Sequence, residues 1–395
     1  MNYHLMIDDK FIDDFIDDAE KVSSKNSNRY FIRGNRQNAI HVKHLKAEWV
    51  EDIWSNDFKA ILNKITSSDK IFIHWYSLDV GKLMLTIDKN IPIYVICWGG
   101  DFYEDPYLYH INWIHDKLTL KYVRKKYIFP KKWAKRPNIF LKQLLTLLKN
   151  KRSIHEDFLL KKKTVQRINF MLIDPNLFHE IELIRKIYDA PKISQLPFGY
   201  NQNFDRAIKL KKYKKNNDFL NIQIGNSATG ANNHMDCIKV LKKFKKEKIK
   251  LIIPLSYGRP DYAEVVKKYC TQVFNNKFEA LEKFMPREEY LKKLNEIDVA
   301  IMFHNRSQAL GNCITLLTLG KKLYLKNKNP LYQFFKTIGV DIFDIKTIKN
   351  LTFEEFSKPL SEEQTQSNIE KISNLFSEEK RLEYLSNILN NKNNL

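Results

Sequence analysis

The chain has few cysteines and no long apolar segment. Its 395 residues include four cysteines, which lie far apart and form no C-x-x-C pair. No run reaches the roughly 18 apolar residues that a membrane-spanning helix needs. The N-terminus runs directly into acidic residues, without the basic start and long apolar core of a secretory signal. We therefore expect reduced thiols, a cytoplasmic protein and no membrane-spanning helix.

The common signatures of phosphate and metal sites are also missing. The sequence has neither a G-x-G-x-x-G motif nor a P-loop lysine, and no internal repeat. Its apolar fraction of 43% is nevertheless sufficient for buried cores, and its length allows two domains. Extensive disorder is thereby excluded.

Apolar strands alternate with amphipathic helices along most of the chain. This alternation predicts parallel, doubly wound sheets, in which ligands bind beyond the carboxyl ends of the strands. Residues 47–65 are expected to form one helix, and 271–274 a short strand. The polar stretch from Lys209 to Asn217 is the best candidate for a domain linker.

One stretch, from Phe219 to His234, combines a strand, a small-residue loop and a helix. The strand ends at Gly225, Asn226 and Ser227, and a helical pattern follows that includes Met235. Free backbone N–H groups and a helix dipole attract anions in such a loop. Taken alone, the stretch fits an ordinary turn equally well.

A second loop of the same kind favours a phosphate site. The strand 299–303 leads to Gly311, where another helix begins, and Arg259 and Arg306 follow strands of the same predicted sheet. Two loops with converging donors and two arginines favour a diphosphate ligand over plain turns.

Two titratable residues stand at strand ends in the first half of the chain. His74 ends the strand 71–74, and Asp101 follows the strand 91–97 and the sequence Trp98-Gly-Gly. That placement fits a general base at a ligand site. The alternatives are a hydrogen-bonded core histidine and a turn-forming aspartate.

Paired aspartates recur at helical spacing near the N-terminus. The pairs 8–9, 13–14 and 17–18 fit either a metal or acid–base cluster or a solvated acidic helix face. Apolar residues separate the pairs on a regular period, which favours the solvated face.

The net charge of +21 is concentrated in one block. Residues 117–163 contain 16 lysines and arginines but only two acidic residues, a net charge of +14. Aromatic residues are interleaved with them. An anionic membrane surface is the favoured partner; a solvated surface and single-stranded nucleic acid are the alternatives. The membrane-facing candidates are Lys125, Lys126, Lys131, Lys132, Trp133 and Arg136.

Several motifs together resemble a known family. They are W-G-x-D-x-Y-E from Trp98 to Glu104, G-N-S-x-x-x-x-N-x-H from Gly225 to His234, residues 72–74, 253–254 with Tyr257, 308–311 and 327–330. The chain resembles the 4-alpha-L-fucosyltransferase family, glycosyltransferase family 56. These bacterial enzymes move 4-acetamido-4,6-dideoxygalactose from a dTDP donor to a lipid-linked oligosaccharide.

The resemblance implies a fold and a domain arrangement. The fold would be α/β with GT-B architecture, two Rossmann-like doubly wound domains facing across a cleft. Residues 1–200 would bind the acceptor and carry the basic block, 218–375 would bind the nucleotide sugar, and 376–395 would form a C-terminal helix and tail. No metal and no cofactor would be required.

The resemblance also implies roles for residues. Asp101 would be the catalytic base or an acceptor contact, with His74 and Glu104 behind it, and it would deprotonate the acceptor hydroxyl if the reaction inverts the anomeric centre. Gln308 stands where many GT-B enzymes carry a sugar-contacting glutamate, and Thr315 is the candidate for the ribose because Leu316 occupies the usual glutamate position. The donor-binding set is Gly225, Asn226, Ser227, Tyr257, Arg259, Phe284, Met285, Arg306, Gln308, Gly311, Asn312, Cys313 and Thr315.

The expected function follows from this resemblance and the basic block. The protein would be a glycosyltransferase using a dTDP-linked deoxy-amino sugar, a polyprenyl diphosphate-linked or oligosaccharide acceptor, and an anionic membrane surface. It would lie peripherally on the cytoplasmic face of the inner membrane and serve surface polysaccharide synthesis. The alternatives are a GT-B transferase for a UDP- or GDP-sugar and, less favoured, a non-enzymatic nucleic-acid-binding protein.

Overall fold

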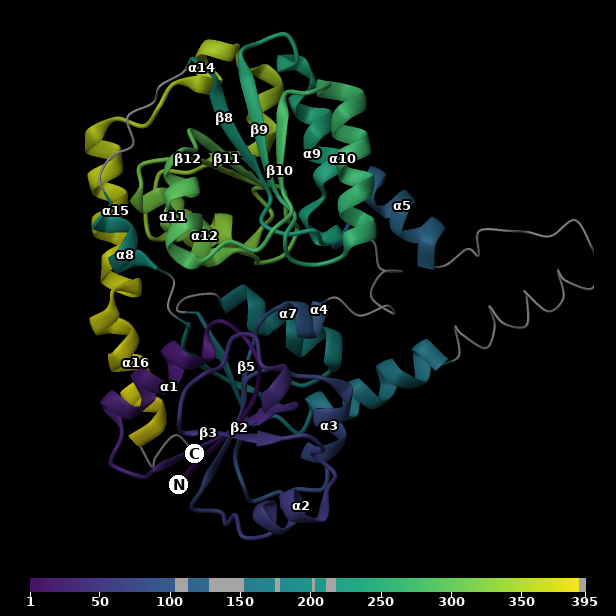
Figure 1. Cartoon of the computed structure of the whole chain (residues 1–395), viewed down its shortest axis with the longest axis vertical. Helices are drawn as coiled ribbons and strands as arrows, with labels where there is room; N and C mark the ends of the chain where they lie inside the picture. The colour runs from purple at the N-terminus through teal and green to yellow at the C-terminus, as the bar shows by residue number, and fades with distance from the viewer. Residues whose placement is uncertain (104–112, 128–152, 175–177, 201–202, 211–217, 391–395) are drawn as a thin grey trace, which may run out of the picture. The chain divides into compact units, whose positions relative to one another are not determined.

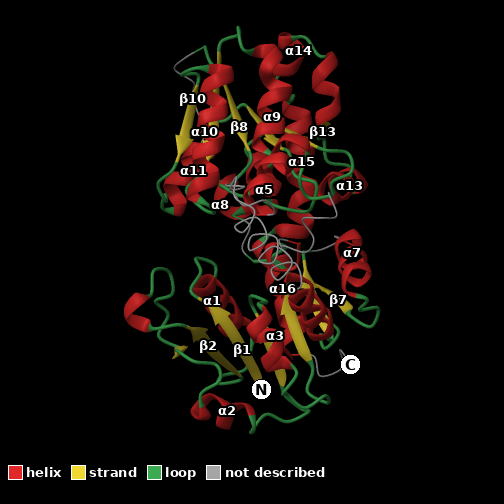
Figure 2. Cartoon of the chain, turned by 90° about the vertical axis from the view of Figure 1, so that its right-hand side faces the viewer, coloured by secondary structure: helices red, strands yellow, loops and turns green. Residues whose placement is uncertain are grey.

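The computed structural model describes residues 1–103, 113–127, 153–174, 178–200, 203–210 and 218–390. The chain divides into two compact units. Unit 1 comprises residues 1–107, 149–201 and 378–395, and unit 2 comprises 108–148 and 202–377. Each unit is built on one sheet with helices on both faces (Figure 1; Figure 2). The predicted doubly wound α/β class is therefore confirmed.

Unit 1 is organised around a seven-stranded parallel sheet of order β3-β2-β1-β4-β5-β6-β7. Its inner strands are apolar on both faces, as a parallel sheet covered by helices on both sides requires. The strands are β1 (Asn2–Ile7), β2 (Asn28–Arg33), β3 (Ala47–Val50), β4 (Lys70–Ile73), β5 (Ile93–Ile96), β6 (Phe170–Ile173) and β7 (Ser194–Pro197).

The helices of unit 1 come from both ends of the chain. Helix α16 packs against α1, and Leu385, Ile388 and Leu389 join the same buried cluster as Phe15. The C-terminal residues therefore belong to the N-terminal unit. The labelled helices are α1 (Ile12–Val22), α2 (Asn56–Leu62), α3 (Leu78–Met84), α4 (Gly100–Tyr103), α7 (Phe178–Tyr188) and α16 (Glu378–Asn390).

Unit 2 is organised around a six-stranded parallel sheet of order β10-β9-β8-β11-β12-β13. Because all strands run the same way, the loops after β8, β9, β10, β11 and β12 share one edge, as the sequence predicted. The strands are β8 (Leu220–Ile224), β9 (Ile249–Pro254), β10 (Phe278–Leu281), β11 (Val299–Met302), β12 (Lys322–Leu325) and β13 (Phe343–Asp344).

The helices of unit 2 include one from the basic block. None of the helices in the described ranges of the chain is both long and apolar enough to cross a membrane. The α-helices are α5 (Lys117–Tyr127), α8 (Phe204–Ile208), α9 (His234–Leu241), α10 (Pro260–Phe274), α11 (Arg287–Asn295), α12 (Leu310–Thr318), α13 (Pro330–Thr337), α14 (Phe353–Ser357) and α15 (Glu362–Phe376).

Two predicted elements are wrong. Residues 47–65 are not one helix: β3 pairs with β2, and α2 begins only after Ser55, whose side chain caps it. Residues 271–274 are not a strand but the last turn of α10, because Val266, Cys270 and Phe274 share one buried helix face. The β-branched Thr271 and Val273 favoured a strand in the prediction, but burial of one helix face in the folded protein outweighed their strand propensity.

The aspartates near the N-terminus hold a neighbouring loop. Asp8 accepts hydrogen bonds from the backbone N–H groups of Ile40, His41 and Val42, and Asp13 accepts from Lys43 and His44. Burial would raise the pKa of Asp8, but the three backbone N–H donors outweigh it and lower that pKa. These two carboxylates anchor the loop, a role that neither interpretation of the sequence, a solvated helix face or a metal or acid–base cluster, had included.

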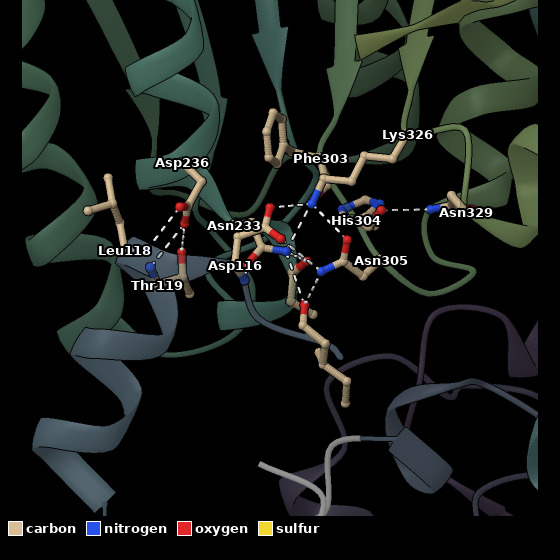
Figure 3. A network of polar contacts seen from close by, with 12 residues as sticks. Asp116, Leu118, Thr119, Asn233, Asp236, Phe303, His304, Asn305, Lys326 and Asn329 are labelled. Atoms are coloured by element: carbon tan, nitrogen blue, oxygen red, sulfur yellow. Dashed lines mark hydrogen bonds and ion pairs between the residues drawn. The ribbon is translucent and has the colours of Figure 1, made fainter. Parts of the chain in front are cut away.

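Helix α5, which begins the basic block, packs on unit 2. The N–H groups of Leu118 and Thr119 donate to the carboxylate of Asp236 on α9 at 2.9 and 3.0 Å (Figure 3). The Thr119 hydroxyl donates to the same carboxylate at 2.9 Å. A carboxylate here pairs the otherwise unsatisfied donors of the first helical turn and complements the helix dipole. The sequence assigned residues 117–163 to the first domain, whereas residues 108–148 group with unit 2.

Replacement of Asp236 is expected to loosen α5. The variant Asp236→Ala removes three hydrogen bonds to a charged acceptor, and a local loss of about 1–3 kcal/mol is expected. Hydrogen–deuterium exchange of the 117–127 peptide measures it, with the exposed Lys239→Ala on the same helix as control. Unchanged protection of α5 in Asp236→Ala would show that this carboxylate does not anchor the helix.

Candidate functional site

The loop after β8 begins with a turn that only glycine fits. Gly225 has a φ of +63°, and a Cβ there would lie 2.4 Å from Asn232 Oδ1 and 2.9 Å from His234 Nε2. Its N–H donates to the carbonyl of Ile301 on the neighbouring β11 at 3.0 Å. The backbone therefore leaves the sheet at Gly225 and turns back against buried polar side chains.

The side chain of Asn232 shapes this loop. Its Oδ1 accepts the N–H of Asn226 at 2.9 Å and lies 2.8 Å from Nε2 of His304. Its Nδ2 donates to the carbonyl and hydroxyl of Ser227 at 2.9 and 3.0 Å. Asn232 is fully buried, so these bonds are formed away from water and hold Asn226 and Ser227 in one arrangement. The sequence motif contained Asn232, but its role as the centre of the loop appears only in the structure.

Gln308 joins this polar group from the loop after β11. Its Nε2 donates to Oδ1 of Asn226 at 3.0 Å. This hydrogen bond connects two of the loops predicted to bind the nucleotide sugar. The other amide atom, Oε1, is buried and meets no partner within the described parts of the chain, as is also true of His234 Nε2. Buried polar atoms of this kind indicate a polar lining suited to a ligand. Burial also lowers the pKa of His234 to about 3, so this imidazole is neutral at neutral pH.

Both predicted strand–loop–helix transitions are present. Helix α9 starts at His234, after a short 3-10 turn at 230–232, and contains Met235 as the sequence predicted. Helix α12 starts at Leu310, with Ala309 in a left-handed conformation at φ +62°. The N–H groups of Gly311 and Asn312 belong to its first turn, whose donors have no partner within a helix.

Two of the residues predicted to bind the nucleotide sugar form hydrogen bonds within α12 instead. The N–H of Cys313 donates to the carbonyl of Ala309 at 2.9 Å, so this N–H is not available to a phosphate as predicted. Burial raises the pKa of the Cys313 thiol to about 12. The Thr315 hydroxyl donates to the carbonyl of Gly311 at 2.7 Å and the residue is 1% exposed, which does not fit the predicted ribose contact.

The loop after β9 is joined to the Gly225 loop through Ala228. The N–H of Ala228 donates to the carbonyl of Tyr257 at 2.6 Å, and the N–H of Arg259 donates to the carbonyl of Ala228 at 2.9 Å. Gly258 permits this approach, since a Cβ there would lie 2.7 Å from the Ala228 oxygen. The Arg259 side chain is 52% exposed and its Nε donates to Asp261 at 3.3 Å.

The remaining predicted donor residues vary in exposure. Arg306 is only 4% exposed and its guanidinium donates to the carbonyl of Ser307 at 2.8 Å, so it is less accessible than the sequence suggested. Tyr257 and Phe284 are 66% and 61% exposed, and Met285 is partly exposed beside Phe284. Large exposed rings at a ligand edge suit stacking with a flat base.

A partly buried ion pair lies at the same edge of unit 2, and the sequence did not indicate it. The ammonium of Lys326, after β12, pairs with the carboxylate of Asp116 and donates to Asn305 Oδ1 at 2.8 Å (Figure 3). Asn305 Nδ2 in turn donates to Asp116 Oδ1 at 3.1 Å. Burial lowers the pKa of Lys326, although Asp116 opposes that effect. This closed set of bonds, together with Asn233, binds the segment before α5 to unit 2.

His74, at the end of β4 in unit 1, lies within a buried hydrogen-bonded row. Its Nδ1 is 2.6 Å from the Tyr200 hydroxyl and its Nε2 is 3.1 Å from Nδ1 of His4. Burial, followed by the nearby His4, holds the pKa of His74 well below its usual range. With both ring nitrogens occupied, the geometry fits the alternative interpretation of a hydrogen-bonded core histidine.

Asp101, at the start of α4, is a buried carboxyl group. It is 6% exposed, Oδ2 accepts the backbone N–H of Trp98 at 3.5 Å, and Oδ1 has no partner among the described residues. Burial raises the pKa of Asp101 to about 7, with the Lys161 ammonium acting in the opposite direction. The ammonium donates to the Asp101 carbonyl at 2.7 Å. A carboxyl group poised near neutral pH has the property that a general base requires.

Several predicted residues lie outside the described part of the chain. They are Glu104, Lys131, Lys132, Trp133 and Arg136; Lys125 and Lys126 lie in α5, but their side chains are not described. Within the ranges that the structure does describe, no three His, Cys, Asp or Glu side chains gather as a metal site would need.

Residues 180–375 match the family model described as 4-alpha-L-fucosyltransferase, glycosyl transferase group 56. This segment contains every predicted donor residue, whereas the motif from Trp98 to Glu104 lies before it. The resemblance to this family is thus confirmed over residues 180–375, and the protein is a glycosyltransferase.

Solved structures of glycosyltransferases share the fold of the whole chain. A trehalose-6-phosphate structure from E. coli, bound with UDP-2-fluoro glucose, has a TM-score of 0.62 at 9% identity, with 100% of this chain and 99% of that chain covered. Sucrose-phosphate synthase from Thermosynechococcus elongatus has a TM-score of 0.61 at 11% identity, with 98% of both chains covered. The UDP-forming alpha,alpha-trehalose-phosphate synthase from Burkholderia vietnamiensis has a TM-score of 0.60 at 8% identity, with 98% of both covered. The predicted GT-B architecture is thereby confirmed.

Proposed function

We propose that this GT-B glycosyltransferase transfers a deoxy-amino sugar, 4-acetamido-4,6-dideoxygalactose or a close relative, from a dTDP-sugar to a lipid-linked saccharide. The observation that carries the proposal is the family match over residues 180–375, the segment that contains all the loops predicted to hold the donor. The alternative within the same class is a UDP- or GDP-sugar donor. Surface polysaccharide synthesis is the process in which such a transfer takes place.

The donor diphosphate is proposed to lie at the carboxyl edge of the unit 2 sheet. Asn226 and Ser227 are held in place by Asn232, Arg259 extends from the adjoining loop, and the N–H groups of Gly311 and Asn312 begin α12. Amide donors, an arginine and a helix N-terminus stabilise the charge of a departing diphosphate. Gln308, oriented by Asn226, has an amide oxygen suited to accept a hydrogen bond from the donor sugar.

Asp101 is proposed as the general base of unit 1. In an inverting transfer, the acceptor oxygen forms a bond to the anomeric carbon while the bond from that carbon to the diphosphate breaks. The electron pair of that bond leaves with dTDP, and the hydroxyl proton passes to the Asp101 carboxylate. Its raised pKa supports this role, and His74 acts as a positioning residue through its hydrogen bond to the Tyr200 hydroxyl. Glu104 remains a candidate second carboxylate.

The basic block is proposed to bind the anionic cytoplasmic face of the inner membrane. Its net charge of +14, interleaved with aromatic residues, suits a surface of anionic lipids. A polyprenyl diphosphate acceptor is itself anionic and anchored in the bilayer, so adsorption of the enzyme would concentrate it near its substrate.

Nucleotide binding tests the donor assignment. We expect dTDP to raise the thermal stability of the protein, by about 2.7 kcal/mol at 100 times its dissociation constant, and UDP and GDP to do so less. Arg259→Ala should abolish most of the shift, whereas Asp101→Ala and the exposed Lys268→Ala on α10 should preserve it. A shift with UDP or GDP alone would select the alternative donor, and no shift with any nucleotide would refute the donor site.

The pH dependence of transfer tests the base. Because burial raises the pKa of Asp101 to about 7, we expect kcat/KM to fall as the pH drops below 7, by about tenfold per pH unit. Asp101→Asn should lower kcat by about 100- to 10,000-fold and remove this acid limb. Asp88→Asn, in an exposed loop of the same unit, serves as control. Retention of the acid limb in Asp101→Asn would assign the proton to another group.

Vesicle binding tests the membrane assignment. We expect sedimentation with vesicles containing anionic lipids at low salt, release at high salt, and no binding to neutral vesicles. Lys131→Gln, Lys132→Gln and Arg136→Gln together should weaken binding about 100-fold, at about 1 kcal/mol per charge. The exposed lysines 242, 245 and 246, changed in the same way, provide a control of equal charge. Equal effects of the two triple variants would show that net charge, not this block, is responsible.

A further inference from the structure

The carboxyl edge of the unit 1 sheet carries four aromatic side chains from four separate segments. Phe11 follows β1, Trp75 follows β4, Trp98 follows β5 and Tyr200 follows β7. The ring of Trp98 lies 5.7 Å from Phe11, 5.7 Å from Trp75 and 5.0 Å from Tyr200, measured between centroids. We call these four side chains the aromatic platform.

The platform differs from the aromatic core beneath it in its exposure. Phe15, Phe72, Tyr94 and Phe198 are at most 4% exposed and form the hydrophobic core of the unit. The platform residues are all partly exposed. Packing in the core does not require indole rings at the surface, whereas flat rings with an accessible face bind ligands that offer a matching flat apolar surface.

The candidate base Asp101 adjoins the platform. The backbone N–H of Trp98 points to Oδ2 of Asp101 at 3.5 Å, and the Trp75 ring lies near Gly100, where an added Cβ would be 3.7 Å from the ring atom Cη2. Asp101 Oδ1 is buried and has no partner among the described residues. The residue that carries this unpaired oxygen is thus linked to Trp98 through the Trp98 backbone and to Trp75 through the neighbouring Gly100.

We propose that the aromatic platform is the acceptor subsite and that it binds a pyranose ring. The inference rests on the proposed function. One face of a pyranose presents axial C–H groups, which pack on the electron-rich face of an indole ring, while its hydroxyl groups at the rim are donors for a carboxylate. We expect a sugar stacked on Trp75 or Trp98 to direct a ring hydroxyl toward the Asp101 carboxyl group.

The carboxyl group of Asp101 favours the sugar of a lipid-linked acceptor over its prenyl chain as the ligand of the platform. A prenyl chain has no donor to pair with Asp101 Oδ1, so its binding would leave that buried atom unsatisfied. Asp9, beside Phe11, is a second carboxyl group at this edge, and burial raises its pKa too. Two carboxyl groups among aromatic rings match the alternating hydroxyl and C–H surfaces of a carbohydrate.

The contacts of the platform side chains indicate which of them would stack on the sugar and which hold the stacking rings in position. The Tyr200 hydroxyl is held by His74 Nδ1 at 2.6 Å, and Tyr200 stacks on Phe11 at 5.5 Å. Tyr200 and His74 are therefore positioning residues that fix the height and tilt of Trp98. Trp75 and Trp98, which come directly after inner strands, are the stacking residues.

Saturation-transfer NMR on the full-length protein tests this subsite without a known acceptor. The probes are the methyl glycosides of N-acetylglucosamine, glucose and galactose, with the open-chain polyol mannitol as a control that has no ring face. We expect transfer to the ring C–H protons of at least one glycoside and none to mannitol. Equal transfer to mannitol, or none to any glycoside, would overturn the proposal.

Matched variants assign the effect to the platform. Trp75→Ala and Trp98→Ala should each raise the dissociation constant of the bound glycoside about tenfold. Trp98→Phe, which keeps an aromatic ring, should raise it less. Trp54→Ala is the control, since Trp54 lies beside Asp79 and Lys59, away from the platform contacts. Circular dichroism checks folding of each variant. Glycoside binding that survives Trp75→Ala with Trp98→Ala in a folded protein would overturn the subsite.

A parallel dTDP titration separates this inference from the proposed function. dTDP binding that is equal in the wild type and in both tryptophan variants, with glycoside binding lost only in the variants, supports both proposals. dTDP binding with no effect of the tryptophans on glycosides overturns the platform alone. Platform-dependent glycoside binding without any nucleotide binding would overturn the donor assignment and leave the platform standing.

Discussion

The buried amide of Asn232 is the interaction on which the candidate donor site depends. Gly225 turns the chain out of the sheet, but the backbone that follows has no helix to order it, because α9 starts only at His234. Asn232 supplies that order by accepting from Asn226 and donating to Ser227. Because the Asn232 side chain is fully buried, water cannot replace any of these hydrogen bonds, so losing one would leave a buried polar atom unpaired at a cost in free energy. Gln308 and Arg259 then take their places relative to this loop.

The same physical effect, burial of titratable groups, acts with opposite results in unit 1. It keeps His4 and His74 neutral, so the row from His4 through His74 to Tyr200 holds together without charge. It also raises the pKa of Asp101 to about 7, the range suited to the general base proposed above. Burial of an ionisable carboxyl group is costly unless the group is paired, and Oδ1 of Asp101 has no partner among the described residues.

Much of the fold followed from local patterns. Apolar runs such as 93–96 and 220–224 are strands because a parallel sheet buries both of their faces, and their number and alternation predicted two doubly wound sheets. Segments of mixed character misled prediction: 47–65 contains a strand whose partner β2 lies elsewhere in the chain, and 271–274 carries β-branched residues inside a helix. The motifs also located Asn226 and Gln308 in the loops after β8 and β11, and Asp101 in the segment after β5, where the structure places them.

The sequence by itself determined which residues stand at the carboxyl ends of strands, because strand periodicity and turn residues are local properties. Only the tertiary structure decided which of them act together. It took Cys313 and Thr315 out of the candidate site by internal hydrogen bonds and buried Arg306. It also attached α5 to unit 2 through Asp236 and joined Asp116 to Lys326. The attachment of α5 and the Asp116–Lys326 pair depend on partners far apart in the chain. Burial and pKa likewise depend on such tertiary contacts, which no local pattern contains.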